Sequence, residues 1–140
     1  MRAKTTMTHE LTLRVHYEDT DMAGVVYYAN YLKFIERGRS EALREAGVDQ
    51  RAMREEGVVF VVTDVTAKYH SPARYDDELA VRTELGEVKR AWASLVQTVR
   101  RGDELLFSST VRFACMTVEG RLLRLPEPAV AALNGLRSGD

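Results

Sequence analysis

Residues 17–31 read Tyr-Glu-Asp-Thr-Asp-Met-Ala-Gly-Val-Val-Tyr-Tyr-Ala-Asn-Tyr, and this stretch decides how the whole chain is interpreted. Two carboxylates, Asp19 and Asp21, and the glycine Gly24 come just before an aromatic step into a long helical pattern. A carboxylate placed ahead of a helix start lies beside backbone N–H groups that have no partner inside the helix. Such groups can hold a carbonyl oxygen as it gains negative charge, so the stretch is suited to acyl-transfer chemistry.

The pattern that follows predicts one long helix among several strands. Apolar residues recur at three- and four-residue steps over 28–46, with Asn30 as the expected N-cap and Gly47 as the expected end. Alternating or continuous apolar runs bounded by turns predict the remaining elements. These are strands over 11–17, 58–69, 79–85, 91–100, 105–118 and 121–124, a short polar helix over 49–56, and a terminal helix over 129–136.

Short turns between consecutive strands imply an antiparallel sheet, and a single long amphipathic helix covering one face gives an α+β layer arrangement. One helix does not cover a wide sheet, and the outer strands keep open edges. Because pairing with a second copy would protect such an edge, we expect a homodimer.

Length and composition narrow the classes of protein that the chain can represent. The 140 residues suit a single domain over 1–140, with a loose N-terminal segment at 1–9. A net charge of −1 argues against nucleic acid as a partner, and the single cysteine, Cys115, excludes a disulfide framework within one chain. No apolar run approaches the ~18 residues of a membrane span and no signal-type segment begins the chain, so we expect a cytoplasmic protein.

The motifs together resemble the hotdog-fold acyl-CoA thioesterases, in particular the YbgC-type enzymes and 4-hydroxybenzoyl-CoA thioesterase. The resemblance is specific in the first segment, and it extends in order through the rest of the domain. The matching segments are 17–21, 24–31, 34–37, 69–77 and 124–126. The resemblance implies a hotdog fold in which an antiparallel sheet of five to six strands wraps the central helix. It also implies dimers joined edge to edge, active sites at the subunit interface, and tetramers built from two dimers.

The resemblance assigns the chemistry to Asp21, which matches the catalytic carboxylate of the family. Asp21 would act either as a general base toward water or as a nucleophile that forms a mixed anhydride, and the sequence does not decide between them. The backbone N–H of Tyr28 would polarise the thioester carbonyl, while Gly24 and Val25 would lie against the substrate. Many YbgC-type enzymes carry histidine where this chain has Tyr28, which leaves the preferred acyl group open. Asp19 is expected to hydrogen-bond the loop backbone.

Coenzyme A is part of the substrate, so no separate cofactor is expected. Its phosphates suit Lys89, Arg90 and Arg74, and Ser94 could hydrogen-bond the pantetheine or a phosphate. Each of these residues could equally be an ordinary solvated surface group.

The three histidines, His9, His16 and His70, do not have metal-ligand spacing, so no metal site is expected.

The sequence therefore predicts hydrolysis of an acyl-CoA to a free acid and coenzyme A. A non-catalytic module that binds acyl-CoA or acyl-carrier protein is the alternative, because basic residues at a pocket mouth would suit either partner. Asp21 argues against pure binding, since a carboxylate beside a thioester adds reactivity and little affinity. A hotdog-fold hydratase is a third possibility, but its distinct motif is not found.

Overall fold

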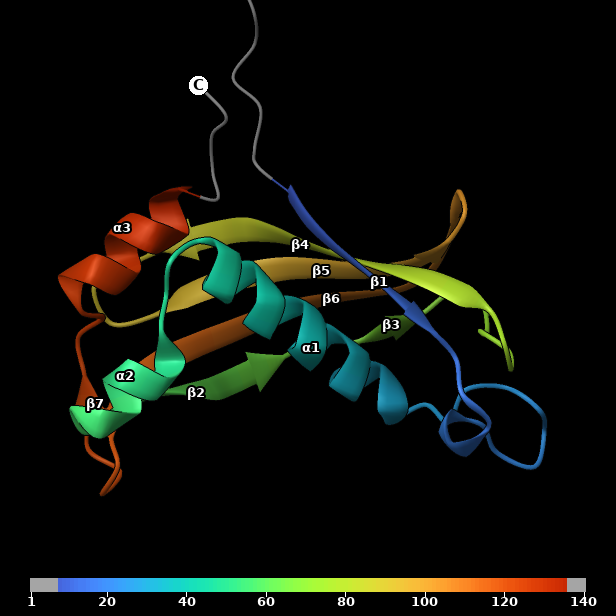
Figure 1. Ribbon diagram of the computed structural model, residues 1–140, viewed down its shortest axis with the longest axis horizontal. Helices are drawn as coiled ribbons and strands as arrows, with labels where there is room; N and C mark the ends of the chain where they lie inside the picture. Colours follow the sequence, from blue (N-terminus) through green and yellow to red (C-terminus); the bar gives the residue numbers. More distant parts are fainter. Residues whose placement is uncertain (1–7, 136–140) are drawn as a thin grey trace, which may run out of the picture.

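A computed structural model describes residues 8–135, in which one long helix lies across a curved antiparallel sheet (Figure 1). The elements, in chain order, are β1 (Thr8–Arg14), the 3₁₀ turn η1 (Tyr17–Asp19), α1 (Asn30–Glu45), α2 (Gln50–Glu55), β2 (Val58–Val65), β3 (Lys68–Tyr69), β4 (Glu78–Val88), β5 (Ala93–Arg101), β6 (Glu104–Thr117), β7 (Leu122–Leu123) and α3 (Glu127–Gly135). The expected α+β arrangement of a long helix against an antiparallel sheet is confirmed.

The strand order is β1-β4-β5-β6-β2, and β3 and β7 both pair with β6. Within residues 8–135 the sheet therefore has seven strands, where five to six were expected. The difference arises because the predicted strand over 58–69 is broken into β2 and β3. The register against β6 shifts between Val62 and Asp64. The Thr66 N–H donates to the Thr110 carbonyl, and the Thr66 hydroxyl accepts from the Thr110 N–H. These two bonds hold the chain at the sheet without continuing the pairing of β2 with β6.

Three predicted boundaries in the first part of the chain are wrong. The first strand ends at Arg14, and Tyr17 is 81% exposed because the chain turns into η1 there. Residues 8 and 9 pair with β4, although they were expected in a loose segment whose other residues, 1–7, lie outside the described part. The N-cap of α1 is Ala29, because the Asn30 side chain donates instead to the Asp19 carbonyl at 2.9 Å.

Helix α1 packs closely on β4 at Gly38. A Cβ at this position would lie 2.6 Å from Cγ1 of Val81, which is fully buried. The Val81 side chain thus occupies the space that a larger residue at position 38 would need. Buried aromatic and aliphatic side chains fill the layer around this contact, including Tyr31, Phe34 and Phe107.

A row of polar side chains crosses this core beneath α1. Thr83, Gln97 and Ser109 face one another on β4, β5 and β6, and all three are buried. The Gln97 amide donates to the Ile35 carbonyl of α1 at 2.8 Å and to the Thr83 hydroxyl at 2.9 Å. Its oxygen accepts from the Arg39 guanidinium at 3.1 Å, and burial lowers the pKa of Arg39. The row therefore ties the helix to the sheet through hydrogen bonds.

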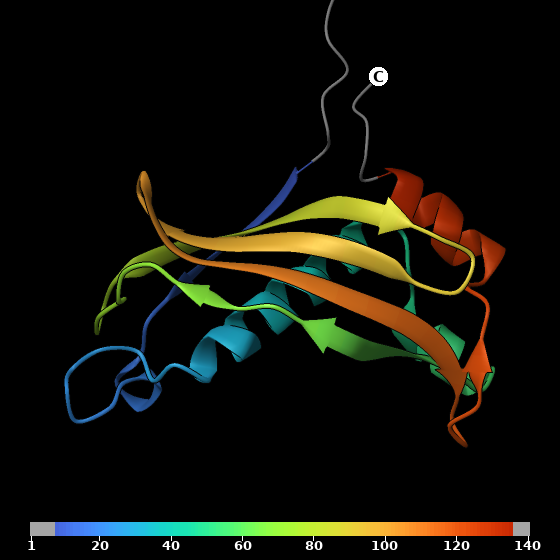
Figure 2. The same cartoon turned by 180° about the vertical axis from the view of Figure 1, so that it is seen from behind.

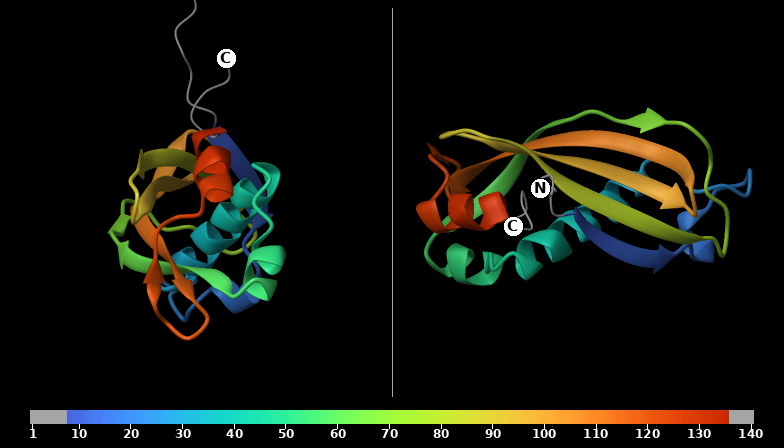
Figure 3. Two further views of the ribbon diagram at one scale, coloured as in Figure 1. Left: turned by 90° about the vertical axis from the view of Figure 1, so that its left-hand side faces the viewer. Right: turned by 90° about the horizontal axis from the view of Figure 1, so that it is seen from above.

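Different elements lie at the two ends of the long axis of the molecule. The hairpin ahead of α1 lies at one end, and α3 lies with the β4–β5 turn at the other (Figures 1 and 2). Seen along and above this axis, the sheet curves over α1 and leaves the far side of the helix uncovered (Figure 3). Strand β2 ends the strand path, and its Val62 and Val65 are 42% and 44% exposed. No helix between residues 8 and 135 is long and apolar enough to cross a membrane.

Candidate functional site

The hairpin that carries Asp21 is held together by its own backbone. Thr20 and Val26 form an isolated antiparallel bridge. The Asp21 N–H donates to the Val25 carbonyl at 3.0 Å, and the Gly24 N–H donates to the Asp21 carbonyl at 2.9 Å. Gly24 has a φ of +82°, a conformation that residues with a Cβ rarely adopt, so glycine suits this turn.

The Asp21 carboxylate lies exposed on this hairpin. Its Oδ1 accepts from the Ala23 N–H at 2.9 Å, which orients the side chain within the turn. Its Oδ2 has no hydrogen-bond or ion-pair partner among the residues that the structure describes. One carboxylate oxygen is thus fixed by the backbone, and the other is available to a proton or an electrophilic carbon.

The start of α1 presents an unused donor. The Tyr27 N–H donates to the Asp19 carbonyl at 2.9 Å, and the Asn30 N–H donates to the Tyr27 carbonyl at 2.8 Å. Between them, the Tyr28 N–H has no acceptor within residues 8–135. A backbone donor without a partner at a helix start is the feature that binding of a carbonyl oxygen requires.

Asp19 has the structural role that was predicted for it. Its carboxylate accepts from the His16 N–H at 2.8 Å. Its carbonyl receives both the Tyr27 N–H and the Asn30 side chain. Asp19 therefore connects η1 to the start of the helix, and its carboxylate is occupied.

Two tyrosines, Tyr31 and Tyr69, gather beside Tyr28; they lie in the matching segments 24–31 and 69–77, but the sequence predicted no role in the site for either. The Tyr69 hydroxyl donates to the Tyr28 carbonyl at 2.9 Å, and the Tyr31 hydroxyl accepts from the Ala73 N–H at 3.0 Å. Burial raises the pKa of both phenols. A cavity of about 280 Å³ lies here, lined by Val26, Tyr28, Tyr31, Tyr69, His70, Ser71 and Pro72.

Arg74 lies at the same end as Asp21. It forms an isolated bridge with Val25, and the neighbouring Val26 N–H donates to the Ala73 carbonyl at 2.8 Å. The Arg74 N–H donates to the Asp77 carboxylate at 2.8 Å. The segment around Arg74 thus supports the hairpin, and it brings the backbones of Val25 and Arg74 together.

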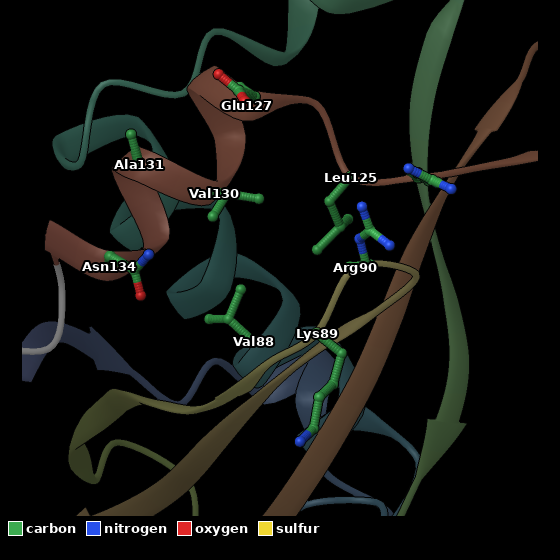
Figure 4. A pocket seen from close by; sticks show the side chains of 9 residues that line it. Val88, Lys89, Arg90, Leu125, Glu127, Val130, Ala131 and Asn134 are labelled. Carbon is green, nitrogen blue, oxygen red and sulfur yellow. The ribbon is translucent and has the colours of Figure 1, made fainter.

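Lys89 and Arg90 lie at the opposite end of the protomer, on the turn between β4 and β5. They face α3 across a cavity of about 890 Å³ (Figure 4). Arg124 also lines this cavity, although the sequence analysis had not proposed it. The Leu125 N–H donates to the Arg90 carbonyl at 2.9 Å, which holds the segment before α3 against the turn. Within one protomer, these basic residues are not near Arg74 or Asp21.

Ser94 does not line that cavity. Its side chain lies in the irregular part of the β4–β5 pair, where its hydroxyl accepts from the Glu87 N–H at 2.9 Å. Gly86 leaves room for this contact, since a Cβ there would come 2.5 Å from the Ser94 hydroxyl. The hydroxyl is therefore engaged in local structure, apart from Lys89 and Arg90.

The histidines lie apart from one another. His9 contacts Glu45 at 3.1 Å, His16 precedes η1, and His70 contacts the Ser108 hydroxyl at 2.9 Å. Nowhere in the described part of the chain do three or more histidine, cysteine or acidic side chains come together as metal ligands would.

Comparison with known proteins places these features in a family. The family model of the thioesterase-like superfamily matches residues 15–133. An acyl-CoA thioesterase YbgC from Haemophilus influenzae is 40% identical over 128 residues, which cover 89% of this chain and 93% of that protein. An acyl-CoA thioester hydrolase YbgC from Escherichia coli O6:H1 is 38% identical over 125 residues, covering 89% and 81%. The crystal structure of a probable thioesterase from Bartonella henselae superposes with a TM-score of 0.78 at 36% identity, covering 86% of this chain and 99% of that one.

Proposed function

Because the chain belongs to the thioesterase-like superfamily and is a thioesterase with a hotdog fold, we propose that it hydrolyses acyl-CoA thioesters with Asp21 as the reacting carboxylate. One observation carries the assignment of residues. The hairpin that presents the Asp21 carboxylate leads directly into a helix start whose Tyr28 N–H has no acceptor among the described residues. Acyl transfer needs this combination, a carboxylate together with a donor for the carbonyl oxygen.

The reaction proceeds by addition to the thioester carbon. Either Asp21 takes a proton from water as the water attacks, or Asp21 itself attacks and water then cleaves the mixed anhydride. In both routes the carbonyl oxygen becomes negative and is held by the Tyr28 N–H. The carbon–sulfur bond then breaks, and the coenzyme A thiolate leaves and takes up a proton. Loss of one such donor typically costs ~3 kcal/mol in the barrier.

The positions of the basic residues support a site shared by two subunits. Lys89 and Arg90 suit the phosphates of coenzyme A, as does Arg124, yet they lie at the end of the protomer away from Asp21. An antiparallel pair of protomers joined at an exposed edge such as β2 would set Asp21 beside Lys89 and Arg90 of the partner subunit. We therefore propose a homodimer, alone or within a dimer of dimers, as the active form. The cytoplasmic location and an acyl-carrier protein as partner stay predictions.

The test of the activity is thiol release by the purified full-length protein from short-chain, long-chain and aromatic acyl-CoAs. We expect turnover of at least one class and a fall of about 10²-fold or more in Asp21→Asn, the loss typical of a missing acid–base group. Glu18→Gln, which removes an exposed carboxylate from the same loop, is the matched control. Undiminished turnover in Asp21→Asn would remove Asp21 from the mechanism. Tight binding of acyl-CoA without thiol release would replace hydrolysis by the binding-module alternative.

Subunit mixing tests the shared site. Asp21→Asn and the double variant Lys89→Glu/Arg90→Glu are each expected to be weakly active alone. After the subunits are exchanged, half of the dimers contain one of each, and each of these has one intact site. About a quarter of the wild-type activity should therefore return. If mixing restores no activity although native mass spectrometry demonstrates subunit exchange, the whole site would lie within one protomer.

A further inference from the structure

Tyr69 connects the sheet to the residue whose N–H is proposed to hold the substrate carbonyl. It lies on the two-residue strand β3, where it pairs with Phe107 of β6. From there its hydroxyl reaches the start of α1 and donates to the Tyr28 carbonyl at 2.9 Å. This contact joins two segments 41 residues apart in the chain.

The Tyr28 carbonyl is one that the helix itself leaves unused. In the first turn, the Leu32 N–H donates to the Ala29 carbonyl at 3.2 Å, one residue closer than in a regular α-helix. The Asn30 N–H donates to the Tyr27 carbonyl. Neither bond involves the Tyr28 carbonyl, so its direction is set by the Tyr69 hydroxyl.

The Tyr69 ring is anchored independently of its hydroxyl. Its centroid lies 5.0 Å from the ring of Phe107 and 5.4 Å from that of Tyr31, both of which are buried. The ring also meets the edge of Tyr28 at 6.2 Å. Replacing the hydroxyl with hydrogen should therefore leave the ring where it is, and only the bond to the Tyr28 carbonyl would be lost.

We propose that Tyr69 is a positioning residue for catalysis, whose hydroxyl holds the Tyr28 backbone so that the Tyr28 N–H meets the carbonyl oxygen in the transition state. The proposal rests on the proposed function of that N–H. The Tyr28 carbonyl lies in one rigid peptide plane with the Ala29 N–H, and this plane joins that of the Tyr28 N–H at the Tyr28 Cα, so the bond from Tyr69 holds this Cα at the open end of the helix. A donor acts on a developing oxyanion only within about 2.7–3.1 Å, so a small displacement weakens it.

The phenol is suited to this task. A phenol has an ordinary pKa near 10, so the Tyr69 hydroxyl is protonated and able to donate at neutral pH, and burial raises its pKa further. Tyr69 makes no proton transfer in this scheme, and it acts on the reaction only through the Tyr28 backbone.

The test compares Tyr69→Phe with the wild-type full-length protein on the acyl-CoA that is turned over fastest. We expect kcat to fall about 5-fold or more, as loss of one hydrogen bond implies, while KM changes less than twofold. The ¹H–¹⁵N amide resonances of Tyr28 and Ala29 should move more than those of other residues. Tyr75→Phe, which removes the hydroxyl of another exposed tyrosine, is the control and should retain kcat.

The outcomes separate this proposal from the one on which it rests. A wild-type protein that releases no thiol would overturn the proposed function. An active wild type with unchanged kcat in Tyr69→Phe would overturn the role of Tyr69 alone. Tyr69→Leu, which also removes the ring, should lower both kcat and the melting midpoint. If Tyr69→Phe lowered the midpoint as much as Tyr69→Leu does, Tyr69 would be a packing residue, and the proposal would be wrong.

Discussion

Gly38→Ala is the sharpest test of how α1 is seated on the sheet. In an exposed helix this change stabilises a protein by up to about 1 kcal/mol, because alanine is the better helix former. Here the new Cβ would lie 2.6 Å from Cγ1 of Val81, closer than carbon atoms approach without one of them moving. Val81 is fully buried on β4, so the helix or the strand must shift. Such overpacking costs about 1–3 kcal/mol, which exceeds the gain in propensity.

The expected net effect is a loss of about 1 kcal/mol in the free energy of unfolding, measured by urea denaturation followed by circular dichroism. A Val81→Ala background provides the control, because it removes the carbon atom that the new Cβ would meet. In that background Gly38→Ala should become neutral or stabilising, so the two changes should couple favourably in a double-mutant cycle. A rise of about 1 kcal/mol from Gly38→Ala in the otherwise unchanged protein would refute the close packing of helix on sheet.

Three further predictions follow from buried or partly buried groups. Burial raises the pKa of Asp77, but hydrogen bonds from the Arg74 N–H and the Arg101 guanidinium outweigh it and hold the pKa below 3.8. Its contribution is therefore present at neutral pH and lost as the pH falls through the lowered pKa. Asp77→Asn should lower the free energy of unfolding by about 1–2 kcal/mol at neutral pH and by progressively less below pH 3.8. An equal loss at neutral pH and at the lower pH would contradict the ion pair. Burial raises the pKa of the Cys115 thiol to about 11, so alkylation of this thiol should be negligible in the folded protein and rapid in urea. Alkylation of Cys115 in the native protein would disprove its burial. Gln97→Leu should cost about 2–3 kcal/mol in urea unfolding, since it removes the hydrogen bonds to the Ile35 carbonyl, the Thr83 hydroxyl and the Arg39 guanidinium, and a neutral effect would show that the polar row is dispensable.

Local patterns in the sequence were sufficient for most of the fold. The three- and four-residue recurrence located α1, and alternation located the long strands, because burial of one face requires those periods. Asp19 was also interpreted correctly, since the backbone N–H that its carboxylate binds lies within a few residues. The start of α1 was misplaced because the Asn30 side chain bonds a carbonyl 11 residues earlier, which no capping pattern reveals.

Features that depend on long-range contacts could not be predicted from local patterns in the sequence. The division of 58–69 into β2 and β3 follows from the register against β6, and the engagement of Ser94 follows from the irregular pairing of β4 with β5. The Tyr69 hydroxyl was missed for the same reason, because it acts on Tyr28 across the end of the sheet. Lys89 and Arg90 were chosen for their charge and for their place at a turn, and the sequence does not reveal that this turn lies at the end of the protomer away from Asp21 (Figure 1).

The hairpin that carries Asp21 has a consequence for how such a protein can diversify. The bonds that shape it run between residues 20 and 26, so the turn is specified locally and only its base is attached to the segment at 73–74. A change elsewhere in the sheet can therefore alter the surroundings of the hairpin without disturbing the carboxylate. Conversely, the turn can be transplanted as a short cassette into a related scaffold. Selection can thus alter other parts of the molecule while the Asp21 turn is inherited intact.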